Sequence, residues 1–141
     1  MKLKELVDIY KTLGDATVTA LEESEILKIV EIRKAIRPYA EAHNAFLTDL
    51  AEKLKPANFE DMQKRAQEWN SLTESEKIEL NVQFKDYENK IIIAAQDELN
   101  KEIDITLEKL SKDSSIKLLK NNEWPTNKLD ELSAILWKEM N

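Results

Sequence analysis

Residues 22–54 read EESEILKIVEIRKAIRPYAEAHNAFLTDLAEKL, and this stretch decides the fold class. Its apolar side chains recur every three or four positions, which is the spacing of one face of an α-helix. A continuous helix here would be about 50 Å long. Because Pro38 lies inside the pattern and lacks a backbone donor, we expect either a kink near Arg37 or a break into two helices. The apolar face is formed by Ile26, Ile29, Val30, Ile36, Tyr39, Ala40, His43, Phe46, Leu47, Leu50 and Leu54.

Further helices are expected before and after this stretch. Residues 3–13 have helical spacing, and Gly14 stands where a left-handed C-cap is common. Asn58 can cap a short helix that follows a turn. Thr73-Glu74-Ser75-Glu76 matches a capping box, which predicts that a second long helix starts here and runs to about residue 100 or 102. Its predicted buried face consists of Leu80, Phe84, Tyr87, Ile91, Ala95 and Leu99.

The period of the sequence changes at residues 103–108, where apolar and polar side chains alternate. Alternation predicts a strand with one face in water. A lone strand would leave its backbone groups unpaired, so it needs a partner. The other β-leaning segment is residues 16–21, and we therefore expect a minor two-stranded β-ribbon between the two.

Two helices are expected in the last part of the chain. Ser111 or Asp113 starts a short helix that ends at Asn121-Asn122. Thr126 then caps a last amphipathic helix that runs through Leu129 and Leu136 to Met140.

The composition supports a mainly α fold: an irregular helical bundle with one long helix hairpin, in a single domain over residues 1–141. One Gly and three Pro in 141 residues are too few for a fold rich in tight turns. The chain has no cysteine, no apolar run long enough to span a membrane and no signal peptide, so we expect a cytoplasmic protein. The net charge of −7, with acids and bases interleaved, offers no basic stripe for direct nucleic-acid binding.

No catalytic residue, cofactor site or metal site is predicted. His43 is the only histidine, so a triad that uses His would have to run through it, and a zinc site would need carboxylates for its other ligands. Its position on the apolar face of the long helix favours a packed structural histidine. A single Gly also excludes the usual phosphate-binding loops and nucleophile elbows.

Two acidic stretches are interpreted as structural. Glu22, Glu23 and Glu25 lie at a helix start, where carboxylates stabilise the positive end of the helix dipole. The second stretch is interpreted as a solvent-exposed face. Its members are Asp97, Glu98, Glu102, Asp104 and Glu108.

Three apolar residues are candidates for an interaction surface. Ile91-Ile92-Ile93 covers more than one side of a helix, so Ile92 and Ile93 are available for a partner. Trp137 is the third candidate, because tryptophan often anchors protein interfaces.

The order of these elements resembles a class of small proteins of unknown function that tailed phages and prophages encode. The resemblance rests on the stretches Lys4-Glu5-Leu6…Tyr10…Leu13, Ile29…Arg33-Lys34…Ile36, Glu102-Ile103-Asp104-Ile105…Leu107-Glu108-Lys109-Leu110-Ser111 and Leu129…Leu132…Ile135-Leu136. Genes of this class are often found near tail and host-recognition modules. The resemblance implies a phage or prophage origin, in the host cytoplasm or on the virion, and it supplies no site residue.

Two functional hypotheses follow, and an enzyme is the least favoured third. The first is a non-enzymatic structural or assembly protein, whose helical packing surfaces bind copies of itself or a larger phage component. The alternative is an acidic inhibitor that binds a basic host protein of defence or nucleic-acid processing. An enzyme would have to rely on carboxylates, alone or with bound Mg²⁺, and loss of activity on changing His43, Asp97 or Glu98 would be its signature.

Overall fold

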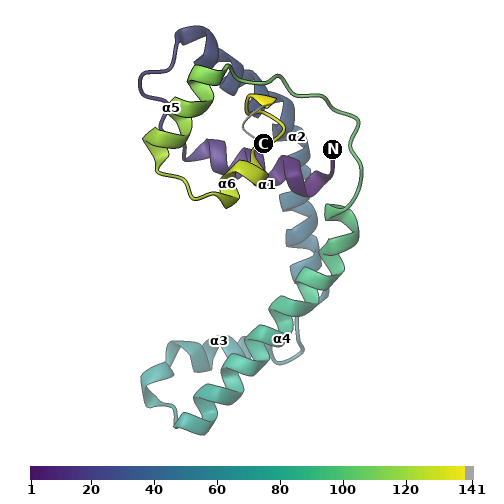
Figure 1. Ribbon diagram of the computed structural model, residues 1–141. Helices are drawn as coiled ribbons and strands as arrows, with labels where there is room; N and C mark the ends of the chain where they lie inside the picture. Colours follow the sequence, from purple (N-terminus) through teal and green to yellow (C-terminus); the bar gives the residue numbers. More distant parts are fainter. Residues whose placement is uncertain (139–141) are drawn as a thin grey trace. The chain divides into compact units, whose positions relative to one another are not determined.

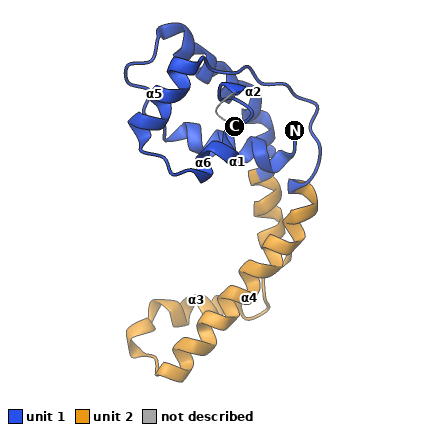
Figure 2. Cartoon of the chain, viewed as in Figure 1, with its two compact units in different colours: residues 1–43, 99–141 blue, residues 44–98 orange. Residues whose placement is uncertain are grey.

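The computed structural model describes residues 1–138, and it confirms the mainly α fold (Figure 1). Its helices are α1 (Leu3–Gly14), α2 (Glu23–Lys53), α3 (Phe59–Gln67), α4 (Glu74–Leu99), α5 (Lys112–Asn122) and α6 (Asn127–Glu131), with a 3-10 turn η1 (Trp69–Ser71). The chain forms two compact units (Figure 2). Unit 1 combines residues 1–43 with the chain from residue 99 onward, and unit 2 consists of residues 44–98. A single domain over residues 1–141 stays a prediction.

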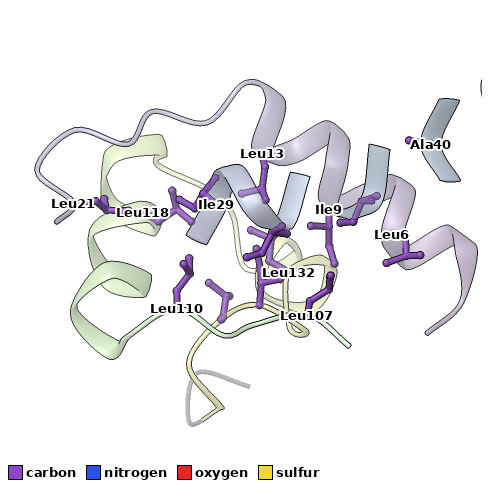
Figure 3. Close-up of a cluster of buried hydrophobic side chains, with 14 residues drawn as sticks. Leu6, Ile9, Leu13, Leu21, Ile29, Ala40, Leu107, Leu110, Leu118 and Leu132 are labelled. Carbon is purple, nitrogen blue, oxygen red and sulfur yellow. The ribbon is translucent and has the colours of Figure 1, made fainter. Parts of the chain in front are cut away.

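The main apolar core lies in unit 1 (Figure 3). It joins α1, the first part of α2, the extended segment after α4, and the C-terminal elements. The apolar face predicted for residues 22–54 omitted Ile32, which is buried, and it wrongly included Val30, which is 40% exposed. Core side chains are Leu6, Ile9, Leu13, Leu21, Ile29, Ile32, Ile36, Ala40, Leu107, Leu110, Leu118, Leu132, Ile135 and Leu136.

Helix α2 runs unbroken through Pro38, so the alternative of two separate helices is wrong. The side chain of Pro38 is exposed, and so is that of Lys34 one turn earlier. The carbonyl of Lys34, which loses its helical partner to the proline ring, therefore faces the wet side of the helix. Water can satisfy that carbonyl, and this lowers the cost of a proline in a helix interior.

The left-handed cap expected at Gly14 is also wrong, because Gly14 is the last residue of α1 and does not have a positive φ. The following turn is closed by the amide of Ala16, which donates to the carbonyl of Leu13 at 3.3 Å. A Cβ atom at position 14 would lie 3.4 Å from the guanidinium of Arg33. That distance is an ordinary van der Waals contact, so neither the surroundings of position 14 nor its backbone conformation requires a glycine.

The predicted β-ribbon between residues 16–21 and 103–108 is wrong. Residues 101–103 pair instead with the first residues of the chain: the amide of Ile103 donates to the carbonyl of Met1 at 2.7 Å, and the amide of Leu3 to that of Lys101 at 2.9 Å. The result is an isolated antiparallel bridge between Lys2 and Glu102.

The other proposed ribbon segment is held by a side chain of α5. The amide group of Asn122 accepts from the backbone of Thr17 at 2.7 Å and donates back to it at 3.0 Å. These two bonds take the place of those that a neighbouring strand would make, which is why no strand forms here.

The capping box at the start of α4 is confirmed. The amide of Glu76 donates to the hydroxyl of Thr73 at 3.2 Å, and the amide of Thr73 donates to the carboxylate of Glu76 at 3.3 Å. Ser111 caps α5 in the predicted way, since its hydroxyl accepts from the amide of Ser114 at 3.1 Å. Asn58 precedes α3 but makes no side-chain cap bond.

The prediction of a long last helix is wrong, because α6 ends at Glu131. Bonds from outside the helix take up the carbonyls that follow. The amide of Leu110 donates to Ile135 at 2.7 Å, and the ammonium of Lys109 donates to the carbonyls of Ser133 and Leu136 at 3.0 and 3.3 Å. Met140, at the expected helix end, lies outside the described residues.

We predict that Pro38→Ala stabilises the protein by about 1–3 kcal/mol, because alanine restores the hydrogen bond to the carbonyl of Lys34 and removes the ring clash. Chemical denaturation monitored by circular dichroism gives the free energy of unfolding. Arg37→Ala, at a neighbouring exposed position, is the control and should change it by less than about 0.5 kcal/mol. A Pro38→Ala protein that is no more stable than the wild type would contradict this explanation.

Candidate functional site

The inner face of α4 forms the interior of unit 2. Leu80 is 1% exposed. The ring of Phe59 in α3 meets Phe84 and Tyr87 edge-on, with centroids 6.4 and 5.3 Å apart. The hydroxyl of Tyr87 also donates to the carbonyl of Ala51 at the end of α2. These contacts fix which side of α4 points inward.

The opposite side of α4 carries large apolar side chains that remain exposed. Ile78, Val82, Ile92 and Ile93 are 64%, 61%, 56% and 67% exposed. At about 100° per residue, these four positions fall within an arc of about 100°, opposite Leu80 and its inner neighbours. Exposed Lys85 and Asn89 lie in the same arc, between the two apolar pairs. The outer face of α4 is defined here as Ile78, Val82, Lys85, Asn89, Ile92 and Ile93.

The structure therefore places two of the three predicted interaction residues, Ile92 and Ile93, on one exposed helix face. It adds Ile78 and Val82, which the sequence analysis missed. The signal that could have found them is the spacing of 78, 82, 85, 89 and 92, which alternates between four and three residues. That spacing is concealed because α4 carries a second apolar face in the same 26 residues.

Trp137, the third predicted interaction residue, belongs to unit 1 and is half-buried. Its amide donates to the hydroxyl of Ser115 at 3.0 Å, and the ammonium of Lys112 lies 5.2 Å from its ring centroid. These contacts give Trp137 a structural role at the start of α5.

His43 is buried, with 4% of its surface exposed, as expected for a histidine packed on the apolar face of α2.

A separate hollow in unit 2 lies between Leu54, Met62 and Tyr87, and its volume is about 150 Å³. Small-molecule sites usually measure about 300–1,000 Å³, so this hollow is small for one.

Glu25 departs from the other two acids at the start of α2, because it is buried at 4% exposure while Glu22 and Glu23 are exposed. Its carboxylate accepts the amide of Ser111 at 2.7 Å and pairs with Lys28 at 3.1 Å. Burial by itself raises the pKa of Glu25, but these hydrogen bonds and the charge of Lys28 outweigh it and hold the pKa below its usual value. The acidic run thus contains one structural carboxylate, which the sequence pattern could not single out.

The second acidic stretch lies mostly in water, as predicted. Asp97, Glu102, Asp104 and Glu108 are exposed, and Glu98 is half-buried. Between them Ile103, Ile105 and Leu107 turn inward, so the alternation was read correctly although no ribbon forms.

The carboxyl of Asp8, in α1, has a raised pKa. Burial and the nearby negative charge of Glu131 raise its pKa, against the opposing effect of Lys4, Lys11 and Lys128. The α1–α6 contact explains this shift, because Thr12 donates to the Glu131 carboxylate at 3.4 Å. A catalytic role is therefore not needed to account for it.

Within residues 1–138, no group of three or more His, Cys, Asp or Glu side chains is arranged to hold a metal ion. No helix in this part of the chain combines the length and apolar character needed to cross a membrane. Comparisons with protein-family models, curated proteins and solved structures found no match to the chain.

We predict that Glu25→Gln destabilises the protein by about 1.5–3 kcal/mol at pH 7, because it removes the charge from a buried hydrogen-bond acceptor. Since the pKa of Glu25 is lowered on folding, its contribution is present above the ordinary value of 4.5 and is lost as the pH falls below it. Free energies of unfolding at pH 3–7 measure this dependence. Glu23→Gln, in the same turn but exposed, is the control, and an equal pH dependence in both variants would contradict the assignment.

Proposed function

We propose that this chain is a non-enzymatic structural or assembly protein of a phage or prophage, which binds protein partners through the outer face of α4. The observation that carries the proposal is the exposure of four large aliphatic side chains, from 56% to 67%, on one side of one helix. Scattered exposed apolar residues need no explanation, but two pairs of large aliphatic side chains on the same side of one helix favour an interaction site.

Packing within unit 2 explains why this face stays uncovered. The inner face of α4 already contacts α3 and the end of α2, through Phe59 and Ala51. Rotating α4 to bury Ile78 and Val82 would expose Leu80 and Tyr87 instead. The outer face can therefore be buried only by another surface, and burial of one such side chain contributes about 1.5–3 kcal/mol.

The phage setting of the proposal is supported by the resemblance in element order described above. Gene neighbours that encode tail or host-recognition components would support it further, and a cluster of genes that inhibit host defence would favour the alternative.

That alternative, an acidic inhibitor of a basic host protein, draws on the net charge of −7. The distribution of charge supports it less. Most ion pairs among residues 1–138 join an acid to a base three or four positions away on the same helix, such as Asp86–Lys90 and Asp113–Lys117. Such pairs neutralise the surface locally, whereas a mimic of nucleic acid would present regular, unpaired negative charge.

We predict that the wild-type protein is found in purified phage particles or assembly intermediates after lysis of a host that carries its gene. The variant Ile92→Asp/Ile93→Asp should be at least about tenfold depleted there, because a charge in the centre of an apolar contact costs at least about 1.4 kcal/mol. Quantitative mass spectrometry of density-gradient fractions measures the depletion.

The matched control is Leu27→Asp, which places the same charge on an exposed leucine of α2 in unit 1, 57% accessible. It should stay in the particle fractions at the wild-type level. Absence of the wild-type protein from every particle and intermediate fraction would overturn the proposed function.

A further inference from the structure

We infer that the outer face of α4 binds the same face of a second copy of this chain, with the two α4 helices antiparallel. This inference rests on the proposed function and names its partner. It is based on the spacing of the face, the order of its polar and apolar residues, and the fact that α4 is already held as a helix in the monomer.

The first observation is the spacing. Positions 75, 78, 82, 85, 89, 92 and 96 are all exposed and are separated alternately by three and four residues. This is the spacing of the a and d positions of a coiled coil over about three heptads and about 30 Å of helix, with Ile78, Val82 and Ile92 as its apolar members. Ser75, Val82, Asn89 and Gln96 then occupy a positions, and Ile78, Lys85 and Ile92 occupy d positions.

The second observation is the position of the polar residues, which decides the orientation. A parallel, in-register pair would place the Lys85 ammonium groups of both copies in one layer, where like charges repel. In an antiparallel pair, a positions face d positions of the partner. Val82 of one copy then lies opposite Ile92 of the other, and Lys85 lies opposite Asn89, whose side-chain carbonyl can accept from the ammonium.

Both polar residues are available for this contact. None of the ion pairs among the described residues involves Lys85, whereas the other two lysines of α4, Lys77 and Lys90, pair with Glu74 and Asp86 on the same helix. Asn89 is exposed beside it. The Lys85–Asn89 layers lie between the two Val82–Ile92 layers of the antiparallel pair, and polar layers of this kind fix register and orientation at some cost in affinity.

The third observation is that α4 needs no partner in order to be helical. Its capping box and the contacts of Tyr87 and Leu80 hold it in the monomer. Association then does not have to order the helix, so the free energy of binding does not include that loss of entropy. This favours a short coiled-coil contact that an isolated peptide could not maintain. Because the same face is used by both copies, the contact closes as a twofold dimer.

The test is sedimentation equilibrium of the full chain at about 1–300 µM, a range that detects dissociation constants in the micromolar region. The wild-type protein should form dimers and nothing larger. Val82→Asp and Ile92→Asp should each weaken the dimer at least about tenfold, while Leu27→Asp leaves it unchanged. Circular dichroism of each variant checks that the monomer stays folded.

Orientation is tested at position 89. In the antiparallel pair, Asn89→Asp sets a carboxylate against Lys85 of the other copy and should tighten the dimer about threefold or more, whereas Asn89→Lys should weaken it. In a parallel pair, Asn89→Asp would oppose two carboxylates and weaken the dimer. Weakening by Asn89→Asp therefore overturns the antiparallel arrangement.

The salt dependence of binding distinguishes a second copy of this chain from a basic protein partner. Each copy carries a net charge of −7, so two copies repel at long range and their association should strengthen as salt rises. Binding to a basic protein would instead weaken as salt rises, because salt screens the attraction. A wild-type chain that is monomeric at every concentration and salt level overturns the inference, and the particle-fraction assay then decides separately whether the proposed function survives.

Discussion

The packing of Phe59 against Tyr87 and Phe84 is the contact on which the arrangement of unit 2 depends. It commits one side of α4 to the interior of unit 2, with the hydroxyl of Tyr87 held by the end of α2. Because a helix has one orientation at a time, this commitment leaves Ile78, Val82 and the pair at 92–93 facing water. The apolar residues of the outer face are thus a consequence of how the unit folds.

Unit 1 depends on a different device, a short run of residues that lies between α4 and α5. This run reaches two separate places: Lys109 and Leu110 donate to carbonyls of residues 133–136 after α6, and Ser111 donates to the buried carboxylate of Glu25. Long-range hydrogen bonds of this kind bring together segments far apart in the chain. They also replace helical bonds, and so they set where α6 ends.

The sequence predicted well what short-range physics controls. Apolar spacing located the long helices, and the reciprocal bonds of Thr73 and Glu76 were evident from four residues. It failed where a distant group decides the outcome: the side chain of Asn122 in place of a strand, or the partners of Lys109 in place of a helix. For the candidate site, Ile92 and Ile93 stood out as adjacent isoleucines, whereas Ile78 and Val82 became visible only when Leu80 and Tyr87 defined the inner side.

The most direct test of the account is a distance between two copies of α4. Because the chain has no cysteine, Ser75→Cys provides one site for a nitroxide label, at an exposed position near the helix start. In the antiparallel pair position 75 lies opposite position 99 of the second copy, so dipolar spectroscopy should give a label separation of about 35–40 Å. A separation of about 10 Å, as in a parallel pair, or no dipolar coupling at high concentration, would contradict the account.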